Sequence, residues 1–182
     1  RAVFIPLPPL TWAEIEECPF GQILDILLAK DTLEQVVQAL PVQIPRPARS
    51  LTTAIFAGGY PVPALSEDTA FRARWFDGYV ATYVERDLRL LSAIDDLVTF
   101  RRFMQAAALR NSSLLNIAQL AQDAGLSPSS AARYLSLLEI SFLVWKLPAF
   151  TVNRGKRLAK SPRLLWVDSG LAAHLAGYRE KS

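Results

Sequence analysis

The sequence is poor in the residues that build disulfides, metal sites and nucleophilic active sites. Its 182 residues include one cysteine, Cys18, and one histidine, His174. A single thiol excludes an internal disulfide and a thiolate metal cluster, so we interpret Cys18 as a packed or incidental thiol. We interpret His174 as a packing or surface histidine, because no ligand or nucleophile lies near it in the sequence. The low cysteine content favours a reducing, cytoplasmic location.

Segments for membranes and nucleotides are also missing. No apolar run reaches the roughly 18 residues of a membrane span, and the proline-rich start is unlike a signal peptide, so we expect no membrane association. No GxxxxGK[ST] phosphate-binding loop occurs. Since a metal-ligand cluster and a nucleophile–base pair are absent too, we expect that this chain is not itself an enzyme and holds no metal or cofactor.

The most informative stretch, residues 117–138, reads as helix, tight turn, helix. Gly125 can take the left-handed conformation that ends the first helix. Ser127 is a typical N-cap, and Pro128 suits the first position of the second helix. The spacing of apolar residues predicts one buried face, formed by Leu120, Ala121, Ala124, Ala131, Tyr134, Leu135 and Leu138.

The opposite face of the second helix carries Ser129, Ser130 and Arg133. In a DNA-binding helix-turn-helix this face is offered to the major groove. The same geometry also serves as a packing corner between helices, so this alternative stays open.

Two β-like apolar runs, 142–147 and 163–167, follow the helix-turn-helix. The loop between them is basic, with Arg154, Lys156, Arg157 and Lys160. A hairpin after a helix-turn-helix makes a winged helix, and the four cations would hold phosphates without reading sequence.

The charge is distributed unevenly along the chain. Residues 1–100 hold 8 basic and 13 acidic residues, a balance of −5, whereas residues 101–182 hold 12 and 4, a balance of +8. The basic half contains the helix-turn-helix, which favours a nucleic-acid partner there. A solvated basic surface is the alternative.

The remaining chain is predicted to be helical. Thr11 and Glu14 form a capping box for a helix from Trp12, and Asp168 begins a last helix at about 171–176. Further helices are expected at 21–30, 31–40, 51–56, about 66–91 and 94–109. The helices at 21–30 and 31–40 carry apolar stripes, formed by Ile23, Leu24, Leu27 and Leu28 in the first and by Leu33, Val36, Val37 and Leu40 in the second.

Four stretches of the sequence carry a family resemblance: GGYP (58–61), RWFDGYVATYVERDLR (74–89), LLNIAQLAQDAGLSPSSAARYLSLLE (114–139) and LPAFTVNRGKRLAKSPRLLWVDSGL (147–171). Together they resemble a family of prokaryotic AAA-type ATPases. The beginning, RAVFIPLPPLTWAE (1–14), resembles the junction at the end of the ATPase core. The chain departs from the usual wording at Val62, where an acidic residue is common, and at Trp166, where Tyr or Phe is common.

The resemblance implies a longer parent protein. Its ATPase core would lie upstream and would bind ATP and Mg, and a nuclease-like segment would lie downstream. Both missing parts would be partners of this chain, and the kinship implies a homo-oligomeric ring. The implied fold class is mainly α: a helical lid-like bundle followed by a winged helix-turn-helix domain with a small β-hairpin.

Three parts follow from this resemblance. Residues 1–10 would end a truncated ATPase core, residues 11–91 would form the lid-like region, and residues 92–182 would form the winged helix-turn-helix domain. A lid arginine near the γ-phosphate would sense nucleotide, because a fixed charge there has its largest effect. The candidates are Arg72, Arg74, Arg86 and Arg89.

Two functions therefore compete. In the first, the chain is the C-terminal fragment of an AAA-type ATPase whose winged helix binds DNA or RNA. In the second, the winged helix is a docking module for a protein or for another domain of the parent, without nucleic-acid binding.

Overall fold

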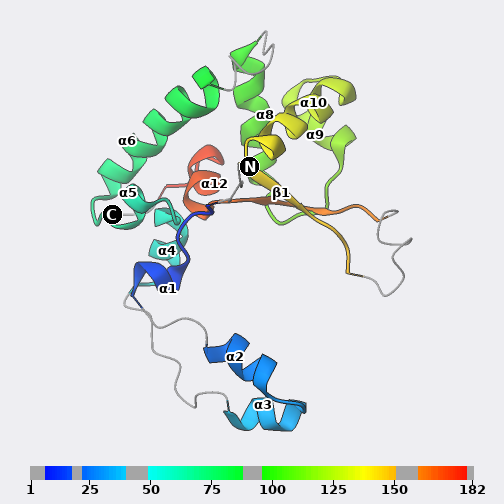
Figure 1. The fold of residues 1–182 in the computed structure, drawn as a ribbon. Coiled ribbons are helices and arrows are strands. Elements are labelled where there is room, and N and C mark those ends of the chain that lie inside the picture. The colour runs from blue at the N-terminus through cyan, green and yellow to red at the C-terminus, as the bar shows by residue number, and fades with distance from the viewer. Residues whose placement is uncertain (1–6, 18–21, 40–48, 88–95, 151–159, 180–182) are drawn as a thin grey trace, which may run out of the picture.

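The computed structural model describes residues 7–17, 22–39, 49–87, 96–150 and 160–179. Within these ranges the chain is mainly helical with one small antiparallel hairpin (Figure 1), which confirms the predicted fold class. The helices are α1 (Trp12–Ile15), α2 (Gln22–Ala29), α3 (Leu33–Ala39), α4 (Leu51–Ala57), α5 (Pro61–Ala64), α6 (Thr69–Tyr79), the π-helix η1 (Val80–Asp87), α8 (Leu97–Leu109), α9 (Ile117–Ala124), α10 (Pro128–Ile140) and α12 (Ser169–Leu175). The strands are β1 (Val144–Leu147) and β2 (Arg163–Trp166).

The predicted helix starts are confirmed by their caps. In α1 the Thr11 side chain accepts from the Glu14 backbone N–H while the Glu14 carboxylate accepts from the Thr11 N–H, which completes the capping box. Asp168 caps α12 through a 2.7 Å bond from the Leu171 N–H. The side chain of Ser127 likewise accepts the Ser130 N–H at the start of α10.

The long helix predicted over about 66–91 changes its winding at Val80. It begins as the α-helix α6, capped by Asp68, and continues as the π-helix η1. The Thr82 hydroxyl donates to the Gly78 carbonyl at 2.7 Å. In an α-helix this carbonyl would accept the backbone N–H of Thr82. Such back-bonding of a hydroxyl to the i−4 carbonyl slightly destabilises a helix and often bends it.

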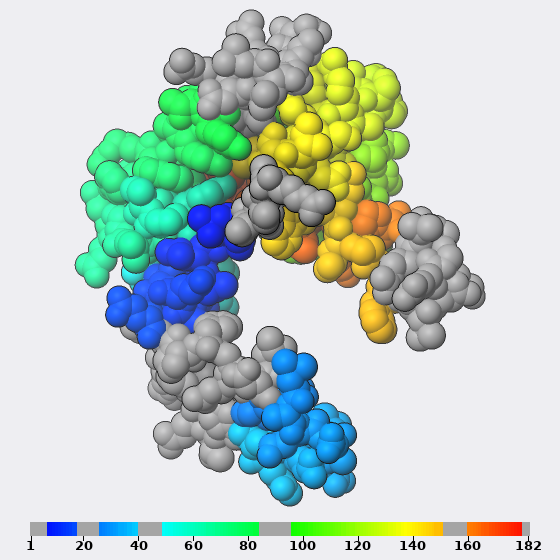
Figure 2. Space-filling view, viewed as in Figure 1, coloured from blue at the N-terminus to red at the C-terminus, as the bar shows by residue number. Residues whose placement is uncertain are grey.

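Helices α2 and α3 leave most of their predicted stripes exposed. Leu27, Leu28, Leu33 and Val37 are exposed, and only Val36 among the stripe residues with described side chains is buried. The two helices pair with each other and lie apart from the main body, at the bottom of Figures 1 and 2. The two helices are short, with 8 and 7 residues, and each covers one face of the other. The described part of the chain leaves the apolar residues on their outer faces uncovered.

One hydrophobic core joins α6, α8, α9, α10 and α12 with the hairpin. Helix α12 lies between α6 and α8 (Figure 1) and also packs on α4 and β2. Phe76 of α6 and Phe100 of α8 belong to the same buried cluster as Leu120 of α9 and Leu171 of α12. Helices from both sides of the predicted 91/92 boundary therefore share this core, and the boundary itself stays a prediction.

Helix α12 packs closely against α4 and α6 at Gly170. A Cβ atom there would lie 2.7 Å from Phe76 Cζ and 2.9 Å from both the Gly58 nitrogen and the Phe56 carbonyl oxygen. Backbone atoms cannot move aside as a flexible side chain can, so only glycine fits this position. Gly78 of α6 is the opposite case, because a Cβ there meets nothing within 4 Å.

We expect Gly170→Ala to destabilise the fold by about 1–3 kcal/mol through overpacking. The matched change Gly78→Ala should stabilise it by about 0.5–1 kcal/mol, because alanine is the better helix former. Urea unfolding followed by circular dichroism measures both. Equal effects of the two substitutions would contradict the close packing of α12 on α4 and α6.

Candidate functional site

The helix-turn-helix forms as predicted. Gly125 lies in the left-handed region (φ 69°, ψ 37°) and ends α9, and α10 begins directly after the Ser127 cap. All seven residues of the predicted inner face are buried, from Leu120 to Leu138. Tyr134 contacts the rings of Phe100 and Phe103 edge-on, which fixes α10 against α8.

The outer face of α10 consists of short side chains and one cation. Ser129, Ala132, Arg133 and Ser136 are exposed at helical spacing, whereas Ser130 is half-buried. Small residues let a partner approach the helix closely, and Arg133 is the long side chain among these four. Its guanidinium carbon lies 5.4 Å from the centre of the Tyr134 ring, a cation–π contact that holds the guanidinium end of the side chain near the ring.

Two of the predicted contact residues also serve the helix itself. The Ser127 hydroxyl lies 2.9 Å from the hydroxyls of both Ser129 and Ser130. This cluster of three hydroxyls stands at the N-terminus of α10, where unpaired backbone N–H groups favour acceptors.

The hairpin predicted after the helix-turn-helix is present. Strands β1 and β2 pair antiparallel, with Val144 opposite Trp166 and Leu147 opposite Arg163. Residues 112–115 pair with the other side of β2, a third short segment that the sequence did not signal. The order of helix, short strand, helix-turn-helix and hairpin is that of a winged helix.

The predicted wing cations are placed only in part. Lys160 is exposed at the approach to β2. Arg154, Lys156 and Arg157 lie outside the described residues.

Three of the four acidic residues in residues 101–182 are compensated within the fold. Asp123 accepts a bidentate contact from Arg110, and Glu139 lies 2.6 Å from Lys146. Asp168 is buried and accepts backbone N–H groups. Arg110 and Lys146 are the basic side chains that pair with these acids, and Arg163 and Arg179 donate to backbone carbonyls.

The Asp168 carboxylate connects two of the stretches that carry the family resemblance. Its Oδ2 accepts from the Gly59 N–H at 2.6 Å, and its Oδ1 accepts from the Leu171 N–H at 2.7 Å. Asp168 is 2% exposed, and burial raises the pKa of its carboxyl while these N–H donors oppose that rise. The Gly58-Gly59 turn is thereby held against the start of α12.

The candidate nucleotide-sensing arginines differ in their surroundings. Arg72 is 5% exposed and donates to the Ser66 carbonyl at 2.8 Å, so it supports the loop before α6. Arg74 is exposed and lies 3.9 Å from Asp68. The backbone of Arg86 belongs to η1, while its side chain, like the whole of Arg89, lies outside the described residues.

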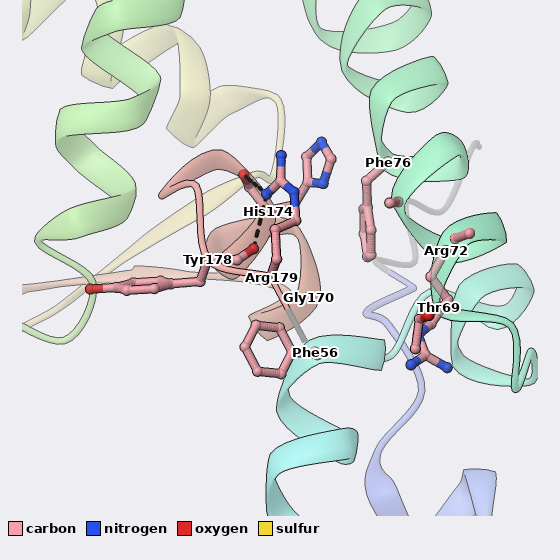
Figure 3. A pocket seen from close by; sticks show the side chains of 10 residues that line it. Phe56, Thr69, Arg72, Phe76, Gly170, His174, Tyr178 and Arg179 are labelled. Carbon is pink, nitrogen blue, oxygen red and sulfur yellow. Dashed lines mark hydrogen bonds between the residues drawn. The ribbon is translucent and has the colours of Figure 1, made fainter. Parts of the chain in front are cut away.

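A small pocket of about 130 Å³ lies between α4, α6 and α12. Figure 3 shows the rings of Phe56 and Phe76 lining it, with Gly170 close to them. His174 lies beside it and is 2.9 Å from Asp77 through Nε2, so its predicted packing role is confirmed by its contacts with α6. Arg179 donates to the carbonyls of His174 and Tyr178 (Figure 3).

Neither a metal site nor a membrane span is evident in the described part. No group of three His, Cys, Asp or Glu side chains converges there. None of the described helices combines the length and apolar character that crossing a membrane requires.

These features define a mainly helical domain built on a helix-turn-helix and a short hairpin. The chain belongs to a family of domains of unknown function, DUF8612, whose model matches residues 48–182. Helices α1 to α3 lie before that match.

Two mycobacterial proteins are similar to the chain. They are "Uncharacterized protein Mb2031c" of Mycobacterium bovis and "Uncharacterized protein Rv2008c" of Mycobacterium tuberculosis. Each is 32% identical over 124 residues, which cover 68% of this chain and 28% of the relative. The matched region thus spans less than a third of either relative. No solved structure matches the chain.

We expect Asp168→Ala to destabilise the fold by about 2–4 kcal/mol, because it leaves buried N–H donors without an acceptor. Asp123→Ala is the matched control: it removes an exposed carboxylate and should cost less than about 1 kcal/mol. Urea unfolding measures both variants. A loss for Asp168→Ala no larger than for the control would contradict the structural role of this carboxylate.

His174 should make stability fall in acid. Burial lowers the pKa of His174, and the nearby Asp77 carboxylate opposes this shift. The unfolded chain therefore binds a proton more readily than the folded one, so stability is lost as pH falls below the unfolded pKa of about 6.5. His174→Gln should flatten the difference in unfolding free energy between about pH 7.5 and about pH 5.5. An unchanged pH dependence in this variant would contradict the assignment.

Proposed function

We propose that this chain is the nucleic-acid-binding part of a protein related to the prokaryotic AAA-type ATPases. The helix-turn-helix would bind DNA or RNA through the outer face of α10, and the parent protein would bind ATP and Mg elsewhere. The observation that carries the proposal is the exposed face of α10, formed by Ser129, Ala132, Arg133 and Ser136. This face lies in the basic half of the chain, residues 101–182, where three of the four acidic side chains are already bonded within the fold.

Geometry and charge favour a nucleic acid in different ways. A helix face of small side chains can enter a groove closely, and Arg133 has the length and the donors to reach base edges or phosphates. The surplus of 12 basic over 4 acidic residues in 101–182 supplies the affinity that does not depend on sequence. In this proposal Lys160, Arg154, Lys156 and Arg157 contact the backbone.

The ATPase kinship rests on the sequence resemblance of GGYP, residues 74–89, the helix-turn-helix and residues 147–171. Two of these stretches, GGYP and the Asp168 segment, contact each other in the fold. We keep Arg74, Arg86 and Arg89 as candidates for sensing nucleotide in the parent, because Arg72 is buried against the Ser66 carbonyl.

An interdomain docking module is the second candidate. It is favoured by apolar side chains that are exposed at the end of α10 and on the hairpin. They are Ile140, Trp145, Leu147 and Phe150. Such a module would not respond to nucleic acid, which makes the two functions separable by one titration.

The test is fluorescence anisotropy of a labelled random-sequence duplex and of its single strand, titrated with salt. We expect a Kd in roughly the micromolar range at low salt that weakens steeply as salt rises. The triple variant Lys156→Ala, Arg157→Ala, Lys160→Ala should lower the salt slope by about 2 to 3, because each lost phosphate contact contributes nearly one.

A second variant pair tests the helix face itself. Arg133→Ala should weaken duplex binding by about tenfold, whereas Arg74→Ala removes the same charge from an exposed site on α6 and should leave binding unchanged. Absence of binding at low salt would reject nucleic-acid binding and favour the docking module, whereas equal losses in both variants would reject the outer face of α10 as the contact surface.

A further inference from the structure

The outer face of α10 has a centre line that follows from the pitch of the helix. Each residue of an α-helix is rotated by about 100° from the one before it, so Ser129 and Ser136 lie only about 20° apart around the axis. Both are exposed, and they lie opposite Ala131 and Leu138, whose side chains are buried. A partner that meets this face squarely therefore meets the line from Ser129 to Ser136 first.

The side chains along this line are short and have few groups that tell bases apart. The Ser129 hydroxyl already lies 2.9 Å from the Ser127 hydroxyl, and Ala132, beside the line, has no polar side-chain atom. The hydroxyl of Ser136 can bond to more than one kind of base edge, so it discriminates little. Strong discrimination comes from two-point contacts of Arg, Lys, Asn or Gln, and none of these residues lies on the centre line.

Arg133 is the one residue of α10 with such a side chain, and it lies to one side. Its position is about 40° from that of Ser129, towards the side where Leu137 is buried. Its guanidinium carbon is 5.4 Å from the centre of the Tyr134 ring, and Tyr134 belongs to the inner face with 4% of its surface exposed. The guanidinium group therefore lies at the flank of the helix and away from the centre line.

A charge at the flank of α10 suits a phosphate better than a base. When a helix lies in the major groove, its centre line faces the base edges and its flanks face the two sugar–phosphate backbones. Arg133 can make a charge-assisted contact to a phosphate from where it lies. To reach a base edge, its guanidinium group would have to leave the Tyr134 ring and cross to the centre line.

The shape of this face favours double-stranded DNA over other nucleic acids. Its short side chains allow the helix to enter the major groove of B-form DNA, which is about 12 Å wide. The major groove of A-form RNA is deep and narrow and does not admit a helix in this way. Unpaired bases are bound by stacking on aromatic rings, and none of the exposed residues of α10 is aromatic.

We propose that α10 binds double-stranded DNA without reading its base sequence, with Arg133 on a phosphate. This inference rests on the proposed function, because it concerns the same face of the same helix. The short side chains from Ser129 to Ser136 let the helix lie in the groove, and the affinity comes from cations on the phosphates. The chain then accepts many sequences alike and does not select one site.

Repeated selection of bound duplexes from a pool of random sequence tests the absence of base readout. We expect no base to be enriched at any position, and unrelated duplexes should bind with Kd values within about threefold of each other, whereas a sequence-reading protein prefers its site by about 10³ or more. An enriched motif whose duplex binds at least about tenfold more tightly would overturn this inference and leave the proposed function standing. Absence of binding to every duplex would overturn both.

A matched pair of variants tests the phosphate contact. Arg133→Lys keeps the charge but loses the planar fork that a two-point base contact needs, so DNA binding should stay within about threefold of that of the unmodified chain. Arg133→Gln keeps a long side chain with an amide donor but loses the charge, so it should weaken binding by about tenfold and lower the salt slope by about one. Equal losses in the two variants would overturn the phosphate assignment.

Duplex RNA of the same sequence is the control for the groove. It carries the same phosphate charge in A-form geometry, so it should bind at least about fivefold more weakly than the DNA duplex in the same buffer. Equal affinity for the two duplexes would overturn docking of α10 in the major groove.

Discussion

The buried Asp168 carboxylate is the interaction on which the arrangement of the helices depends. It bonds two segments that are 109 positions apart, the Gly58-Gly59 turn and the start of α12. Removing a carboxylate from water costs several kcal/mol unless its oxygens find donors, and here both oxygens accept backbone N–H groups. Because α12 packs on α4, α6, α8 and β2, fixing its N-terminus fixes the contact between the helices before residue 91 and the helix-turn-helix.

The sequence predicts best where the structure is determined locally. The helix-turn-helix was predictable because Gly125, Ser127 and Pro128 each act within one or two turns of helix. The buried face of α10 followed from its periodicity. The exposed face was predictable for the same reason, since Ser129 and Arg133 lie opposite the buried stripe, although their role in binding stays a prediction.

Contacts between distant segments could not be predicted in the same way. Nothing in the spacing of residues signals that Asp77 reaches His174, or that Asn111 accepts the Trp166 N–H. The exposure of Leu33 and Val37 was missed because an amphipathic pattern shows which face is apolar but not what covers it. The change of winding at Val80 is likewise a feature that no periodicity of the sequence reveals.

Two consecutive glycines, as in GGYP, are a weak sign of a phosphate-binding loop, but close packing accounts for this pair. A phosphate loop offers unpaired backbone N–H groups to an anion. Here the Gly59 N–H already bonds the Asp168 carboxylate, and the Gly59 carbonyl accepts the Leu10 N–H at 2.7 Å. A Cβ at Gly58 would lie 2.4 Å from an Asp168 oxygen, and one at Gly59 would lie 2.2 Å from Leu10 O. Gly58 therefore allows close approach of an anion that the chain itself supplies, and Gly59 allows close approach of the Leu10 backbone while its N–H holds Asp168.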